Sequence, residues 1–281
     1  VISYLFETKA VKFCEENKPF WYTSGKIGPY FINAQYVYGS EKEAEELLEF
    51  INKELYNKNE LPKNVFDKVL NQYNNNKIYK DSINEMLQCI KDNINIEEID
   101  YVSGGERRDW FFSNLIAYLL KKPHLTIYKD SNIYESNYDF SNTKKIDKLE
   151  NKNVLHVADI ITVASSYVNR WIPSIQKLGS NIKWSLSVID RMQGGTEVLK
   201  ENSVKSLSIA KVDSSLFAKA LDLGIIGNKQ FEMLNKFIKN PDGTMREFLI
   251  AHPEFIENSL KSDEKTRSRA QMCINNNFYN I

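Results

Sequence analysis

The stretch VLHVADIITVASS, residues 154–166, decides the fold because it joins three local patterns in one run. An apolar strand ends in Asp159, a short turn follows, and a helix is expected after the turn. The turn contains three hydroxyl residues, Thr162, Ser165 and Ser166. A strand-to-helix turn of this kind points free backbone N–H groups and the positive end of the helix at one place. The stretch therefore predicts a phosphate-binding turn.

The alternation of strands and helices continues on both sides of this stretch. Apolar strands are expected at residues 99–103, 124–129 and 182–189, and an amphipathic helix begins at Trp110. The polar residues 130–150 read as a long flexible loop, of the sort that compact domains reserve for function. This pattern predicts an α/β fold with a parallel sheet flanked by helices, where ligands bind beyond the carboxyl ends of the strands.

Helical periodicity marks two further regions and the N-terminus. Residues 4–18 have helical spacing up to Pro19, and an aromatic, extended segment follows. The other expected helices cover residues 41–56, 62–74, 79–95, 215–223, 229–239, 244–251 and 254–261. We therefore expect an α/β domain at residues 1–213 with a helical insertion at 41–95, and a helical C-terminal appendage at 214–281.

Composition limits the classes of partner. Lys and Arg together number 37, as do Asp and Glu, so no overall charge favours nucleic acid or an anionic membrane. No apolar run approaches the ~20 residues of a membrane helix, and no signal-peptide pattern opens the chain. The three cysteines lack metal-ligand spacing, which fits a reducing cytoplasm. Small-molecule partners are therefore expected.

Three segments in this order resemble the type I phosphoribosyltransferase family, and within it the orotate phosphoribosyltransferases. They are FWYTSGKIGPYFIN at residues 20–33, the stretch at 154–166, and DRMQGG at 190–195. The resemblance covers roughly residues 5–40 and 99–212. It implies the type I phosphoribosyltransferase fold, a homodimer, and transfer of a ribose 5-phosphate unit from phosphoribosyl pyrophosphate to a pyrimidine-type base, as in nucleotide metabolism.

The resemblance assigns roles to the turn after residue 158. Asp159 would be catalytic and hold the ribose hydroxyls, and Thr162, Ser165 and Ser166 would bind the 5-phosphate. Ala158 stands where the family has the first of two adjacent acids, and the turn lacks the family's glycine. The alternative is that the turn is retained only for folding.

The segment GGERRD at residues 104–109 lies where the family has its pyrophosphate loop. Gly104 and Gly105 would let backbone amides face a ligand, and Arg107 and Arg108 would bind phosphate oxygens through their planar guanidinium groups. The alternative is that the two arginines form surface ion pairs with the two acids of the same segment.

Further catalytic and base-binding residues follow from the resemblance. Lys129 matches a catalytic lysine, whereas residues 130–134 contain neither the lysine nor the histidine of the family's mobile loop. Lys144 and Lys145 could approach from farther along that loop. The residues implied for base binding are Lys26, Tyr30, Phe31 and Arg191. Asp190 and Arg191 could instead form a buried ion pair.

Two functions therefore remain open. The first is an orotate-phosphoribosyltransferase-like enzyme, with any Mg²⁺ held mainly by ligand phosphates. The second is a non-catalytic protein on the same fold that binds a nucleotide or a ribose phosphate. Ala158 and the missing lysine and histidine discriminate between them, because losing one charged transition-state donor commonly costs ~10²–10³ in rate.

Overall fold

The protein is described by a computed structural model that covers residues 1–280, and it divides into two compact units. The first unit contains Val1–Ala10 and Ala34–Val212, and the second contains Val11–Asn33 together with the chain from Asp213 onward. The predicted domain division at residue 213 stays a prediction. The compact units differ from it because Val11–Asn33 packs with the C-terminal helices.

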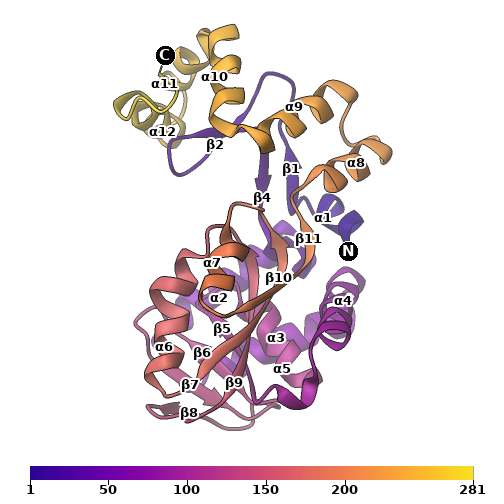
Figure 1. Ribbon diagram of the computed structural model, residues 1–281, viewed down its shortest axis with the longest axis vertical. Coiled ribbons are helices and arrows are strands. Elements are labelled where there is room, and N and C mark those ends of the chain that lie inside the picture. The colour runs from indigo at the N-terminus through magenta and orange to yellow at the C-terminus, as the bar shows by residue number, and fades with distance from the viewer. Residues whose placement is uncertain (281) are drawn as a thin grey trace. The chain divides into compact units, whose positions relative to one another are not determined.

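The first unit is built around a seven-stranded sheet with the strand order β11-β10-β9-β5-β6-β7-β8 (Figure 1). The five strands from β11 to β6 run parallel, and β7 and β8 add an antiparallel hairpin at the edge. This mostly parallel sheet confirms the predicted α/β fold. The strands are β5 (Tyr101–Gly105), β6 (His124–Ile127), β7 (Ile133–Ser136), β8 (Thr143–Ile146), β9 (Asn153–Ile161), β10 (Asn181–Asp190) and β11 (Lys205–Lys211).

The helices of the first unit are α1 (Ile2–Glu7), α2 (Glu41–Glu54), α3 (Leu61–Asn75), α4 (Lys77–Asn93), α5 (Trp110–Leu120), α6 (Ile172–Lys177) and α7 (Gly195–Glu201), with 3₁₀ turns η1 (Ala34–Tyr38) and η2 (Ile96–Glu98) and a π-helical turn η3 (Tyr167–Trp171). Helices α4 to α7 pack against strands of the sheet, and the other helices of the first unit pack on η1 or on neighbouring helices. Ser40 starts α2, where its hydroxyl accepts the Glu43 amide N–H at 3.2 Å, in the manner of an N-cap.

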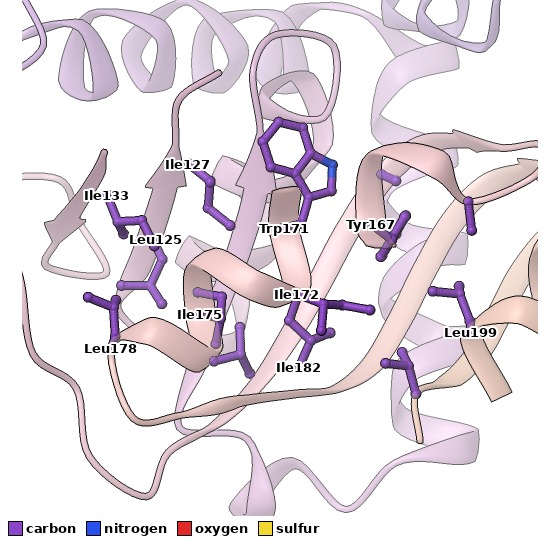
Figure 2. Packing of buried hydrophobic residues seen from close by; sticks show 14 of the residues in the cluster. Leu125, Ile127, Ile133, Tyr167, Trp171, Ile172, Ile175, Leu178, Ile182 and Leu199 are labelled. Atoms are coloured by element: carbon purple, nitrogen blue, oxygen red, sulfur yellow. The ribbon is translucent and has the colours of Figure 1, made fainter. Parts of the chain in front are cut away.

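One hydrophobic cluster fixes the helix that follows the 154–166 stretch. Ile172 and Ile175 of α6 belong to one buried cluster with Leu125 and Ile127 of β6, and Figure 2 labels all four. All four side chains are at most 5% exposed. Burying an aliphatic side chain contributes roughly 1.5–3 kcal/mol. This packing anchors the start of the helix at the carboxyl edge of the sheet, where β9 ends.

Two expectations about local structure are wrong. Residues 130–150 are not a flexible loop, because β7 and β8 form a paired hairpin in which Lys144 meets Glu135 at 3.2 Å. Residues 4–18 are not one helix, because α1 ends at Glu7 and β1 (Val11–Phe13) follows. The two strands of the hairpin, IYES and TKKI, are mostly polar and only partly buried, so their composition reads as a loop.

The second unit combines short strands with five helices. β1 pairs antiparallel with β4 (Tyr30–Ile32), and β2 (Phe20–Trp21) pairs with β3 (Ile27–Gly28). The Trp21 indole N–H donates to the Ser259 hydroxyl at 2.9 Å, which joins the strands to the helices. The helices are α8 (Ser214–Asp222), α9 (Asn228–Lys239), α10 (Pro241–Ala251), α11 (Glu254–Leu260) and α12 (Glu264–Asn275), of which α12 was not predicted.

Candidate functional site

A pocket of about 300 Å³ lies in the first unit, where β5, β6 and β9 end. Parallel strands bring their carboxyl ends to the same edge, and this explains why segments far apart in sequence meet here. The predicted site residues that line the pocket are Arg107, Arg108, Lys129, Asp159, Thr162, Ser165 and Ser166. The structure thus brings together predicted site residues from three separate segments of the sequence.

The turn after β9 presents unpaired backbone amides to this pocket. Among residues 1–280, the N–H groups of residues 163–166 have no hydrogen-bond acceptor in the protein. Ser165 and Ser166 are exposed, and Thr162 is half-buried. The π-helical turn η3 begins directly after Ser166. Consecutive free N–H groups beside hydroxyls form an anion-binding concavity.

The backbone of this turn has the shape that a glycine would favour. Ala164 has φ +55°, in the left-handed region that side chains with a Cβ rarely adopt. The sequence analysis identified this turn as lacking the family's glycine, and the structure places the corresponding conformation at Ala164. Gly195 approaches from the other side, where an added Cβ would lie 2.4 Å from the Thr162 carbonyl oxygen. A close Gly195 backbone therefore supports the turn.

In the loop after β5, the backbone groups of Gly104 and Gly105 form hydrogen bonds within the protein. The Gly105 N–H donates to Asp109 Oδ2 at 2.9 Å, and the Trp110 indole N–H donates to the Gly104 carbonyl at 2.9 Å. A Cβ on Gly105 would lie 2.4 Å from the Trp171 indole, so close packing accounts for this glycine. Among residues 1–280, the residues that line the pocket do not include Gly104 or Gly105. Their phosphate-binding role stays a prediction without support from this geometry.

The two arginines of the same loop do not form the alternative ion pairs. Within the described residues 1–280, no ion pair joins Arg107 or Arg108 to Glu106 or Asp109. Arg107 instead donates to the Asn52 side-chain oxygen. Glu106 faces Lys129, with 3.8 Å between the carboxylate and Nζ, and it also accepts the Lys129 backbone N–H at 3.0 Å. Both arginines thus line the pocket, and the positive charge of Arg108 acts on the Asp159 carboxyl group.

Two buried carboxylates lie beneath the cations. Asp159 is 7% exposed and Asp109 is 8% exposed. Asp109 Oδ1 accepts the Asp159 backbone N–H at 3.2 Å. Burial raises the pKa of Asp159 to about 7, the negative charge of Asp109 adds to the rise, and the positive charge of Arg108 opposes it. The pocket therefore contains an acid that titrates near neutral pH.

His156 lies below these carboxylates inside β9. Its Nδ1 shares a hydrogen bond with the Ser103 hydroxyl at 2.9 Å, and its ring packs edge-on against Tyr167 at 4.8 Å. Its Nε2 lies 3.3 Å from Asp109 Oδ2, although the orientation is not that of a hydrogen bond. Both groups are buried, and a small rotation of the ring would bring Nε2 into hydrogen-bonding orientation. His156 is thus a buried core residue held by these contacts.

Sequence reasoning missed Asp109 as a component of the site. It was considered only as a surface partner for the arginines, but the structure buries it between the ends of β5 and β9. The available signal was weak, since a single acid ahead of Trp110 is typical of a helix start. Only the parallel pairing of β5 with β9 brings it to Asp159.

The predicted base-binding residues lie in both units. In the second unit, Lys26 Nζ lies 2.8 Å from the Asp242 carboxylate, and the Tyr30 ring packs edge-on against Phe237 at 5.5 Å. The Phe31 ring lies 6.1 Å from that of Phe20. In the first unit, the Arg191 N–H donates to the Ile161 carbonyl at 2.9 Å. Their joint role in base binding stays a prediction.

Asp190, the other residue considered with Arg191, organises its own loop. Its carboxylate accepts the Met192 N–H and the Thr196 hydroxyl, each at 2.7 Å. Gly194 follows with φ +90° and begins α7. These bonds fix the turn from which Gly195 approaches Thr162.

Comparisons with known proteins agree with this architecture. No family model matches the chain. An orotate phosphoribosyltransferase of Methanosphaera stadtmanae is 28% identical over 125 residues, which cover 43% of this chain and 67% of the relative. The crystal structure of an orotate phosphoribosyltransferase from Aeropyrum pernix matches 79% of this chain and 98% of its own, with TM-score 0.52 and 16% identity.

A larger protein shares the same fold. The structure of Leishmania donovani UMP synthase matches 85% of this chain with TM-score 0.56 and 12% identity. The chain spans 41% of that protein. The comparisons confirm the predicted resemblance to type I phosphoribosyltransferases and the type I phosphoribosyltransferase fold. They also support the prediction of an enzyme of the phosphoribosyltransferase class.

Other features of the described residues limit what the site can hold. No group of three or more His, Cys, Asp or Glu side chains within residues 1–280 could hold a metal ion. In the same residues, every helix is too short or too polar to cross a membrane. Cys14, Cys89 and Cys273 are free thiols.

Proposed function

We propose that this chain is a phosphoribosyltransferase that binds phosphoribosyl pyrophosphate in the pocket at the carboxyl edge of its sheet and passes the ribose phosphate to a pyrimidine-type base. One observation carries the proposal. Among residues 1–280, Ala164, Ser165 and Ser166 have unpaired backbone amides and line the same pocket as Arg107, Arg108 and Lys129. A pocket with an anion-binding turn and three further cations fits a ligand that carries two separate phosphate groups.

Each part of the pocket has a distinct task in this proposal. The amides of residues 163–166 and the Thr162 hydroxyl bind the 5-phosphate. Arg107, Arg108 and Lys129 neutralise the charge that develops on the departing pyrophosphate, an electrostatic contribution that is large in sites shielded from water. Asp159 accepts a hydrogen bond from a ribose hydroxyl. The glycosidic bond to pyrophosphate breaks, and a nitrogen of the base forms the new bond to the sugar.

The finer points of the proposal concern the metal, the base and the assembly. Mg²⁺ would be held by the pyrophosphate oxygens of the ligand, because the chain offers carboxylates at the pocket but no cage of ligands among residues 1–280. When bound, it would neutralise part of the pyrophosphate charge. Lys26, Tyr30, Phe31 and Arg191 would hold the base. A homodimer in the cytoplasm with a role in pyrimidine synthesis completes the proposal.

A second candidate is a non-catalytic protein that binds a nucleotide or ribose phosphate in the same pocket. Two observations favour it. Ala158 lines the pocket without an acidic side chain. Lys144 and Lys145 belong to the paired strand β8, so they do not sit on a mobile loop that could close over the ligand.

A turnover assay separates the two candidates. We would incubate the protein with phosphoribosyl pyrophosphate, Mg²⁺ and each of a panel of bases including orotate, and measure base-dependent release of pyrophosphate. The enzyme predicts release that is lost in Lys129→Ala and kept in Lys148→Ala, an exposed lysine outside the pocket. Binding of phosphoribosyl pyrophosphate without release supports the second candidate. Absence of binding contradicts both.

A further inference from the structure

Asp109 joins the two strand ends that frame the pocket. Its Oδ2 accepts the N–H of Gly105, at the end of β5, at 2.9 Å. Its Oδ1 accepts the N–H of Asp159, near the end of β9, at 3.2 Å. A single buried carboxylate thereby ties the loop that carries the arginines to the strand that carries the phosphate turn.

Charged and titratable groups approach Asp159 from several elements. Asp109 and Arg108 come from the loop before α5, and their charges act on Asp159 in opposite directions. His156 lies three residues earlier on β9, in contact with Asp109. Tyr167 of η3 is fully buried beside both acids, and burial keeps its pKa well above the ordinary value. Glu106 and Lys129 line the same pocket and face each other.

The charge balance of this cluster favours one negative charge over two. Two ionised carboxylates at this depth would repel each other, since buried charges are only weakly screened. Asp109 accepts the backbone N–H groups of Gly105 and Asp159. The Ile160 backbone N–H favours the ionised form of Asp159, but burial and the charge of Asp109 outweigh it and raise the pKa of Asp159. Asp159 therefore takes up a proton more readily than an ordinary aspartate does.

We propose that Asp109 is a positioning residue that makes anion binding in this pocket depend on pH, by holding the two strand ends together and by placing its own charge against Asp159. This inference rests on the proposed phosphate site. It extends that proposal by naming a residue outside the sequence motif and by giving the site a pH response.

The direction of the response follows from the charges. Asp159 has a raised pKa of about 7, so it is neutral below that pH and negative above it. A dianion in the pocket is repelled by the ionised form, and its affinity therefore falls as the pH rises through about 7. A change of one unit charge at this range alters affinity by roughly tenfold. Asp109→Asn removes one cause of the raised pKa and moves the fall in affinity to lower pH.

The experiment measures sulfate affinity by calorimetry between pH 5.5 and 8.5, since sulfate keeps a constant charge across this range. We expect the wild type to lose roughly tenfold in affinity around pH 7. Asp109→Asn should show the same loss centred at lower pH. The matched control is Asp67→Asn, an exposed carboxylate on α3 paired with Lys63, which should keep the wild-type profile.

The outcomes distinguish this inference from the proposed function. Failure of both sulfate and ribose 5-phosphate to bind at any pH refutes the phosphate site itself. Binding with a flat profile, or with the same midpoint in Asp109→Asn, refutes only the role of Asp109. If Asp109→Asn does not fold, carbon NMR of the carboxyl groups in the wild type tests whether Asp159 has a raised pKa. A signal lost in Asp159→Asn should titrate near pH 7, and titration near 4 would overturn the inference.

Discussion

The two loops at the carboxyl edge of the sheet differ in how they use their backbone. In the turn after β9, the N–H groups of residues 163–166 have no acceptor among residues 1–280. In the loop after β5, the Gly105 and Glu106 N–H groups donate to Asp109 and to the Ile127 carbonyl. Both loops were predicted to bind phosphate, but the amides of Gly105 and Glu106 are already used within the protein, whereas those of residues 163–166 are not. The loop after β5 also places the Arg107 and Arg108 side chains at the pocket.

The largest effect is expected from removing those side chains. The double variant Arg107→Ala, Arg108→Ala should weaken binding of pyrophosphate-bearing ligands by about 10²-fold, because a hydrogen bond to a charged group contributes about 1.5–3 kcal/mol. Ribose 5-phosphate should be spared, since its phosphate lies on the amides of the other loop. Calorimetry with both ligands measures the difference.

The control for that variant is Arg246→Ala, an exposed arginine of α10 in the second unit. It should leave both affinities unchanged. Equal loss of monophosphate and pyrophosphate binding in the double variant would mean that the two loops do not divide the ligand as we describe.

Gly105→Ala tests whether the loop after β5 is held by packing. Its Cβ would lie 2.4 Å from the Trp171 indole, so the free energy of unfolding should fall by about 1–3 kcal/mol. Gly227→Ala is the matched control, because nothing lies within 4 Å of a Cβ there. Urea denaturation of both variants gives the comparison. Similar stability in the two would show that the indole can move aside at little cost.

Thr162→Val tests the hydroxyl beside the free amides. Ribose 5-phosphate should bind roughly tenfold more weakly, because the variant keeps the shape of the side chain and loses one hydrogen bond to a charged group. Calorimetry measures this change. Unchanged affinity would support the alternative that the turn is retained only for folding.

The smallest effect is expected at Ala164. Its φ of +55° is unfavourable for a residue with a Cβ, so Ala164→Gly should raise the free energy of unfolding by up to about 1 kcal/mol. Thermal unfolding of the two proteins measures the change. A loss of stability would show that the entropy of the glycine outweighs the relief of strain.

The sequence predicted the elements whose apolar residues follow a regular period. The helices α2, α3 and α4 and the strands β9 and β10 lie close to their predicted ranges because their buried faces are continuous. The pattern failed where burial is sparse. Helix α12 buries only Ala270 and Cys273, so its mostly polar sequence gave no helical signal.

The same distinction between local and non-local signals applies to the residues of the candidate site. Asp159 and Thr162 could be predicted because they lie in one contiguous motif whose local geometry follows from a strand-to-helix turn. Asp109 could not, because its role depends on the pairing of β5 with β9, which no local pattern of the sequence encodes. The Gly105 N–H has an acceptor within the protein for the same reason, because that acceptor is the Asp109 carboxylate.

The account's central claim is that the amides of residues 163–166 bind a phosphate while those of residues 104–106 do not. Amide NMR during a titration with ribose 5-phosphate tests it directly, because a hydrogen bond to phosphate moves the N–H proton resonance downfield. We predict saturable downfield shifts at residues 163–166 and small changes at 104–106. Shifts confined to residues 104–106, or none in either segment at millimolar ligand, would contradict the claim.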